Sequence, residues 1–377
     1  MNDIESYDDP KLAASVRAWM QREAPAAAPE RLVYSVMDDV GRSPRRRWLG
    51  FGGRPLLRAA ARYAALTLVI AIGVAAGIAL SGRFPSVGGP TPSPTPMPSL
   101  RFVGVVADNG RLLASDAERA WLVSSSRELV PIDADGASGA SIAIPFMPSD
   151  VVTATGRAIP LGEMTVWLAA PDADLLGVDP SSGELVSTNG ARGTRVAVGA
   201  GAAWLGAPGQ LIKVVLGDDA HRTFQVPGHR AEDPILVVGN AVWAATSSGI
   251  ARLDASAGAE EARIPIDASS MVFARGSVWV AQGSHLIALN PTSGTTSRSV
   301  ALSSGAGDIV AIATHGGTVW VATAAGLGPP SLIGVDPTTG GVISITTVAA
   351  PAESLAVVGS QVWTLDASGQ VGRYEPG

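Results

Sequence analysis

Three features of the sequence predict that residues 101–377 form a seven-bladed β-propeller, an all-β ring of four-stranded sheets. A tryptophan flanked by small and apolar residues recurs seven times, at intervals of 36 to 46 residues. A turn that begins with Asp or Asn and ends with Gly follows most of these tryptophans. Repeats of about 40 residues with four short strands each are typical of propeller blades. The seven tryptophans are Trp121, Trp167, Trp204, Trp243, Trp279, Trp320 and Trp363.

The strands of one repeat follow from its alternating apolar runs and turns. The four expected strands, from the inside of the ring outwards, are Ile309 to Thr314, Thr318 to Thr323, Leu332 to Val335 and Val342 to Val348. Residues Ala324 to Pro330 are interpreted as an inserted loop. In the turn from Asp336 to Gly340, the Asp bonds its own backbone, the Pro presets φ and the Gly accepts a positive φ.

We expect the tryptophans to pack between neighbouring blades. Burying such a large flat ring between stacked sheets contributes about 2–3 kcal/mol. The alternative, that the rings stack on a sugar or a cofactor, is weaker because regular apolar stripes are usually core.

Closure of the ring is predicted from the two ends of the repeat region. The last repeat contains only three strand-like runs, at Leu355 to Val358, Gln361 to Leu365 and Val371 to Tyr374. A spare run, Phe102 to Ala107, precedes the first inner strand near Leu112 to Ala114. We expect this spare strand to complete the last blade, which would remove the open edges between the first and last sheets.

Residues 63–82 predict a single transmembrane helix. This run of 20 residues carries no charge, and as a helix it is about 30 Å long, the thickness of the hydrocarbon layer. The preceding segment, residues 42–62, contains seven Arg and no acid, which predicts a cytoplasmic N-terminus and a C-terminal propeller outside the cell membrane. Removal of the segment as a signal peptide, at Ala79-Leu80-Ser81, remains an alternative.

The segments on either side of this anchor differ in character. Residues 1–41 predict a short cytosolic segment of two amphipathic helices, which either forms a plain helical stub or binds a cytosolic protein such as a sigma factor. The zinc-binding form of anti-sigma segment is excluded, because the chain has no Cys and its first His is His221. Residues 83–100 are rich in Pro and predict an extended linker of up to roughly 50 Å.

No motif predicts a catalytic, cofactor-binding or metal-binding residue. The sequence lacks a P-loop, a Gly-x-Ser-x-Gly elbow and a dinucleotide fingerprint, and the absence of Cys excludes thiol catalysis. His221 and His229 lie in an acidic stretch with Asp218, Asp219, Glu232 and Asp233, which we interpret as a solvated loop between blades three and four rather than as a metal site. His285 and His315 lie beside Gly in turns. Residues 84–377 carry a net charge of −10, which argues against nucleic acid as a partner.

The repeats resemble a known family. Residues Gly276 to Ala281, followed by Leu286 to Gly294, look like the YncE, YVTN and virginiamycin-B-lyase-like group of bacterial seven-bladed propellers. The resemblance implies the fold, and a role either in binding at the cell surface or, in one branch, in magnesium-dependent elimination. The lyase branch tends to end its tryptophan strand in Phe-Thr-Glu, and quinone-dependent dehydrogenases with a related repeat carry a second Trp; this sequence has neither.

Three functional hypotheses follow. The first is a membrane-anchored extracytoplasmic propeller that binds a ligand or a protein through its loops or acts as a scaffold. The second is a transmembrane regulator, resembling an anti-sigma factor, with the propeller as sensor domain. The third is a lyase or hydrolase, which requires a His and carboxylates to converge in the central funnel. Binding assays with residues 1–60, run beside the fragment 101–377, would distinguish them.

Overall fold

The computed structural model describes residues 99–116, 118–155, 164–188, 190–215, 220–302, 305–315 and 317–377. The predicted segments 1–41, 42–62 and 63–82, and the linker up to residue 98, lie outside these residues. Within the described ranges the regular structure is all β-strand, and they include no helix long and apolar enough to cross a membrane.

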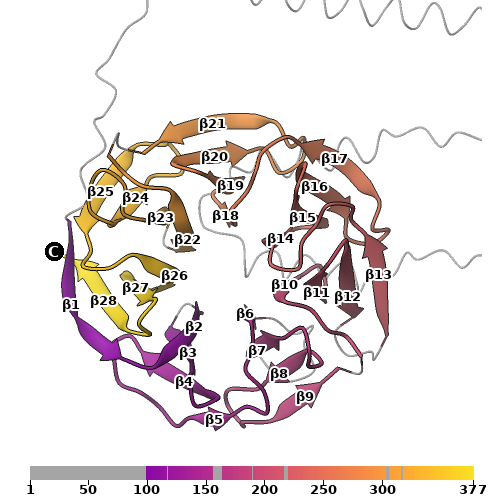
Figure 1. Ribbon diagram of the computed structural model, residues 1–377, viewed down its shortest axis with the longest axis horizontal. Coiled ribbons are helices and arrows are strands. Elements are labelled where there is room, and N and C mark those ends of the chain that lie inside the picture. Colours follow the sequence, from indigo (N-terminus) through magenta and orange to yellow (C-terminus); the bar gives the residue numbers. More distant parts are fainter. Residues whose placement is uncertain are drawn as a thin grey trace, which may run out of the picture. The chain divides into compact units, whose positions relative to one another are not determined.

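Seven four-stranded antiparallel sheets are arranged in a ring around a central axis, as the sequence predicts (Figure 1). Blade 1 contains β2 (Gly110–Ser115), β3 (Arg119–Ser124), β4 (Glu128–Asp133) and β5 (Ile142–Ala143). Blade 2 contains β6 (Asp150–Thr155), β7 (Met164–Ala169), β8 (Leu176–Val178) and β9 (Leu185–Ser187). Blade 3 contains β10 (Arg195–Gly199), β11 (Ala202–Ala207), β12 (Gln210–Val215) and β13 (His221–Gln225).

The remaining blades follow the same order from the channel outwards. Blade 4 contains β14 (Ile235–Val238), β15 (Ala241–Thr246), β16 (Gly249–Asp254) and β17 (Glu260–Ile264). Blade 5 contains β18 (Ser270–Ala274), β19 (Ser277–Gln282), β20 (His285–Leu289) and β21 (Thr296–Ala301). Blade 6 contains β22 (Ile309–His315), β23 (Thr318–Thr323), β24 (Ser331–Val335) and β25 (Val342–Thr347). Blade 7 contains β26 (Ala352–Val358), β27 (Gln361–Asp366), β28 (Val371–Pro376) and β1 (Leu100–Ala107).

Blade 7 closes the ring with strands from both ends of the repeat region. Strand β1 is its outermost strand and pairs antiparallel with β28, with Leu100 opposite Pro376 and Phe102 opposite Tyr374. The predicted completion of the last blade by the spare N-terminal strand is therefore confirmed. The expected strands of blade 6 are also confirmed to within a residue at each end, with Ala324 to Pro330 as the loop between β23 and β24.

The tryptophans pack between neighbouring blades, as expected. All seven are at most 4% exposed. Trp279 of blade 5, for example, packs in one cluster with Val319 and Ile333 of blade 6. The indole N–H of Trp121 donates to Asp116 over 2.8 Å, but five of the other indoles have no hydrogen-bond partner among the described residues. The indoles therefore stabilise the propeller mainly through the apolar surface that they bury.

A second kind of contact between blades is a hydrogen bond from a cation to a backbone carbonyl in the turn of the next blade. In blades 3, 4 and 7 the residue paired with the tryptophan on the next strand is a cation. It donates to a backbone carbonyl in the following blade, in the turn that begins with Asp or Asn; we call these turns the Asp turns. These contacts are Lys213 to Ala255 (2.7 Å), Arg252 to Pro291 (3.0 Å) and Arg373 to Ala134 (2.8 Å). In blade 5 the cation lies one strand further out, where Arg298 donates to Thr338 over 2.7 Å. We call these four contacts the inter-blade latches.

Removing one latch should destabilise the ring. Arg252 is largely buried and its Nε donates across the boundary between blades 4 and 5. Arg252→Met keeps much of the apolar stem but removes the donors, so we expect the free energy of unfolding in urea to fall by about 1–3 kcal/mol. Arg222→Met on the exposed strand β13 is the matched control and should change it by less than about 0.5 kcal/mol. Equal effects of the two substitutions would contradict this role for the latch.

Candidate functional site

A pocket of about 210 Å³ opens at one end of the central channel. Its lining comes from the inner strands of six blades, β6, β10, β14, β18, β22 and β26, and from residues just before them. The lining residues lie at or near the beginning of each inner strand, so the pocket is the channel mouth at that end. We call it the mouth pocket. The residues that line it are Asp150, Arg195, Val196, Pro234, Ile235, Ser269, Ser270, Val310, Ala311, Ile312, Glu353, Ser354 and Leu355.

An ion pair between neighbouring blades forms one wall of the mouth pocket. One carboxylate oxygen of Asp150 accepts a 2.9 Å hydrogen bond from the backbone N–H of Val196, and the other lies 3.4 Å from Nη1 of Arg195. The Nε of Arg195 donates to the backbone carbonyl of Glu232 over 3.0 Å. The Asp150 side chain is 18% exposed and that of Arg195 is 43% exposed. Arg195 is therefore held in position while its guanidinium still reaches solvent.

The protonation of Asp150 reflects two opposing effects. Burial raises the pKa of the Asp150 carboxyl above its usual value, because the charged form loses hydration. The charge of Arg195 and the N–H of Val196 act in the opposite direction, but they offset burial only in part. The carboxylate of Asp150 thus joins blades 2 and 3 at some electrostatic cost.

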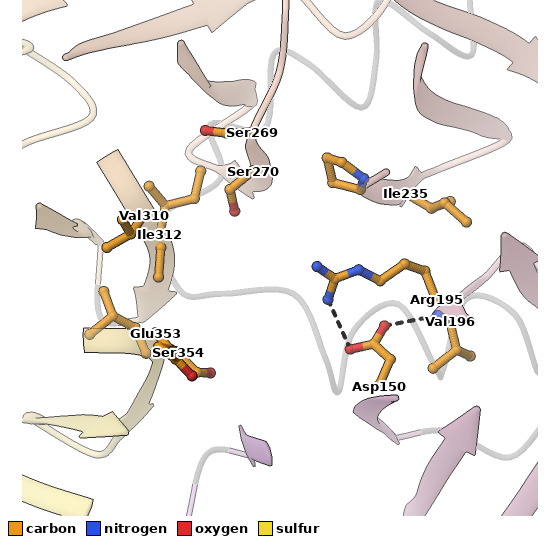
Figure 2. A pocket seen from close by; sticks show the side chains of 13 residues that line it. Asp150, Arg195, Val196, Ile235, Ser269, Ser270, Val310, Ile312, Glu353 and Ser354 are labelled. Carbon is orange, nitrogen blue, oxygen red and sulfur yellow. Dashed lines mark hydrogen bonds and ion pairs between the residues drawn. The ribbon is translucent and has the colours of Figure 1, made fainter. Parts of the chain in front are cut away.

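Charged groups lie on both sides of the mouth pocket, an ion pair on one side and a carboxylate on the other. Figure 2 shows Arg195 and Asp150 on one side and Glu353 with Ser354 on the other. Two of the serines connect neighbouring blades. Ser269 donates to the carbonyl of Ile309 over 3.4 Å, and Ser354 donates to the carbonyl of Leu113 over 3.3 Å. Both bonds cross from one blade to the next.

Three polar groups of the mouth pocket remain available for a ligand. Among the described residues, none accepts a hydrogen bond from Nη2 of Arg195, and none pairs with the exposed carboxylate of Glu353 or the hydroxyl of Ser270. A guanidinium binds carboxylates through parallel N–H donors, and a carboxylate binds ammonium or guanidinium groups. The arrangement therefore suits a ligand that carries both an anionic and a cationic group.

The described part of the mouth pocket lining contains no histidine, and the structure corrects the expected settings of the histidines. His221 was expected in a loop but begins β13, and His285 and His315 were expected in turns but lie at the ends of strands β20 and β22. His229 was expected in a solvated loop, but it is only 3% exposed, so that expectation is wrong. Its Nδ1 lies 2.7 Å from the carbonyl of Ala245, and the ring fits because Gly206 beside it has no side chain; a Cβ there would lie 3.0 Å from Nε2.

No group of three or more His, Cys, Asp or Glu side chains within the described ranges could hold a metal ion. The pocket residues themselves were not predicted from the sequence, although a signal for them exists. Arg195, Ser270 and Ser354 each precede the tryptophan of their blade by nine residues. Alignment of the repeats on their tryptophans would have placed these polar residues on one ring of positions.

Comparisons with known proteins agree with the fold. No protein-family model matches the chain, and no curated protein matches it in sequence. The WD40 β-propeller domain of Doa1 is similar in structure, with 10% identity and a TM-score of 0.54 over 74% of this chain and 97% of that one. BamB from Moraxella catarrhalis has 18% identity and a TM-score of 0.47 over 70% of this chain and 84% of that one. The likeness to the Doa1 domain supports a β-propeller and extends to the fold alone.

The raised pKa of Asp150 leads to a testable pH dependence. An acid whose pKa is raised by folding holds its proton more tightly in the folded state, so that state gains stability as the pH falls from neutral through the folded pKa. Asp150→Asn lacks this gain. We expect the free energy of unfolding of Asp150→Asn, relative to the wild type, to be highest near neutral pH and to decline as the pH falls toward about 4. Urea unfolding of both proteins over this range measures the difference, and a difference that is constant or rises on acidification would contradict the assignment.

Proposed function

We propose that the propeller is a binding module whose mouth pocket receives a charged segment of a partner protein. The observation that carries this proposal is the pair of oppositely charged groups, Arg195 and Glu353, on facing walls of an open pocket (Figure 2). A protein segment with an acidic and a basic side chain satisfies both groups at once. Ser270 between them supplies a further hydrogen-bonding hydroxyl.

Exposed apolar side chains at the pocket end of the ring favour a protein over a small solute as the ligand. Val310 in the pocket lining is 39% exposed, and Leu327 in the loop between β23 and β24 is 97% exposed. That loop is held in place, since Ala324 N–H donates to the carbonyl of Asp308 over 2.8 Å and Gly328 N–H donates to that of Gly305 over 3.0 Å. Because Asp308 directly precedes β22, the loop lies at the pocket end of the channel. A fixed, exposed Leu at the pocket end of the ring resembles the apolar anchors of protein interfaces.

The proposed cellular setting is the outer side of the cytoplasmic membrane. The uncharged run 63–82, preceded by seven Arg in residues 42–62, supports a single span with a cytoplasmic N-terminus. The turn and strand pattern of Gly276 to Gly294 supports a relation to the YncE-like propellers. A cytosolic partner of residues 1–41 remains a further proposal, supported by two amphipathic stretches in that segment.

Membrane anchoring can be tested directly. We expect the full chain to remain in the membrane fraction after alkaline carbonate washing, and deletion of residues 63–82 to release it, because this run alone is long and apolar enough to span a bilayer. A protease added outside intact cells should remove a C-terminal tag and spare an N-terminal tag. Recovery of the unaltered chain in the soluble cytosolic fraction would contradict the anchor.

Binding through the mouth pocket predicts a specific loss of partners. The full chain, tagged in its own host, is recovered after chemical cross-linking and its associated proteins are quantified. Arg195→Ala and Glu353→Gln should each reduce retention of the same protein at least about tenfold, the effect of losing about 1.4 kcal/mol.

The matched controls for this experiment are Arg222→Ala and Glu184→Gln, which remove exposed charges on outer strand β13 and near β9. Circular dichroism and thermal unfolding establish that each variant is folded. If the pocket variants and the controls retain the same proteins in the same amounts, the mouth pocket is not the binding site.

A further inference from the structure

The mouth pocket is small for a ligand that carries two charges. Its volume of about 210 Å³ lies below the range of about 300–1,000 Å³ that is usual for pockets that hold drug-sized ligands. A cavity of about 150 Å³ holds one benzene molecule, so 210 Å³ has room for about eight or nine non-hydrogen atoms. That number is close to the size of one lysine residue. The pocket therefore suits one residue of a partner protein.

A residue at the end of a protein chain can carry both charges by itself. It combines a terminal carboxylate or ammonium with an ionised side chain, whereas a residue inside the chain has neutral backbone groups. An internal segment reaches both Arg195 and Glu353 only with two side chains, and neighbouring side chains of an extended segment point to opposite faces. Such a segment must order about three residues at the mouth, so it loses more conformational entropy than a chain end does.

The positions of the polar and apolar groups favour a C-terminus over an N-terminus. Among the described residues, none accepts from Nη2 of Arg195 and none pairs with the hydroxyl of Ser270, so both groups are available to donate to one carboxylate. Val310 and Glu353 come from β22 and β26 and lie on the opposite side of the pocket from Arg195 (Figure 2). Val310 is 39% exposed, which suits the apolar stem of a lysine or arginine whose cation reaches Glu353. An N-terminal ammonium has no such stem.

We propose that the mouth pocket binds the free C-terminus of a partner protein whose last residue is lysine or arginine. This inference rests on the proposed function and narrows it from a charged segment to a chain end. The terminal carboxylate binds Arg195 and Ser270, the stem covers Val310, and the side-chain cation pairs with Glu353. A free basic amino acid fits less well, because its α-ammonium would lie close to the guanidinium of Arg195; in a protein this group is a neutral amide.

Labelled peptides test the end group. The probe is a six-residue peptide of glycine and serine with fluorescein at its N-terminus and lysine at its C-terminus. Its binding to the purified full chain in detergent micelles is measured by fluorescence anisotropy. We expect the free acid to bind at least about tenfold more tightly than the same peptide with a C-terminal amide. It should exceed by a similar factor a free acid that ends in norleucine, which keeps the stem but lacks the cation.

Substitutions in the pocket assign each charge to its partner. In Arg195→Ala the acid and the amide should bind alike, and in Glu353→Gln the lysine and norleucine peptides should bind alike, because each substitution removes the group that distinguishes the two probes. The matched controls Arg222→Ala and Glu184→Gln remove exposed charges outside the pocket and should retain both preferences. Thermal unfolding establishes that each variant is folded.

The remaining outcomes separate this inference from the proposed function. Equal binding of acid and amide, or an acid preference that persists in Arg195→Ala, would overturn the C-terminal assignment. A peptide with blocked ends and an internal aspartate and lysine might compete as the true ligand class; equal or tighter binding of it, lost in Arg195→Ala, would overturn this inference and support the proposed function. So would exclusive binding of a peptide that begins with a free aspartate. Failure of the free acid to bind overturns this inference alone, and the proposed function fails with it only if the pocket variants also retain the same proteins after cross-linking.

Discussion

The ring depends on the burial of one indole between each pair of neighbouring blades. Each sheet of four strands has two apolar faces, and neither can be covered within its own blade. The tryptophan on the second strand fills the space against the next sheet, and seven such contacts form a closed circuit of apolar clusters. Closure requires that the last sheet be complete, which explains why β1, from the opposite end of the repeat region, is its outermost strand.

Polar contacts support this apolar circuit near the Asp turns and at the channel mouth. Toward the turns that begin with Asp or Asn, each inter-blade latch is a hydrogen bond from a cation of the preceding blade to a turn carbonyl. At the channel mouth, Asp150, Ser269 and Ser354 bond across the blade boundaries. The mouth pocket is therefore built from residues with different duties. Some hold the ring together, and Glu353 has no partner among the described residues. Arg195 has both roles, because it pairs with Asp150 while its Nη2 has no acceptor among those residues.

A feature of this structure could be predicted from the sequence when the residues that form it are close together in the chain. The strands of blade 6 and the closure by residues 102–107 follow from apolar runs and turns that are local in sequence. The mouth pocket could not be assembled in this way, because Asp150 and Glu353 are separated by most of the repeat region. Several lining residues occupy the same position in their repeats, nine residues before the tryptophan. The residue type at that position varies among Arg, Pro, Ser and Ala, so no sequence motif identifies the pocket. His229 was misplaced because its burial depends on the missing side chain of Gly206, which is remote in sequence.

The sequence by itself determined the fold class, the number of blades and the way the ring closes. These features rest on periodic burial of tryptophan and on turn chemistry, both of which repeat along the chain. Only the tertiary structure decided which charges meet at the channel mouth, which cations reach the next blade and which apolar side chains stay exposed. The physical reason is that packing seven sheets around one axis brings together residues from different repeats, and exposure is defined only once that packing is complete.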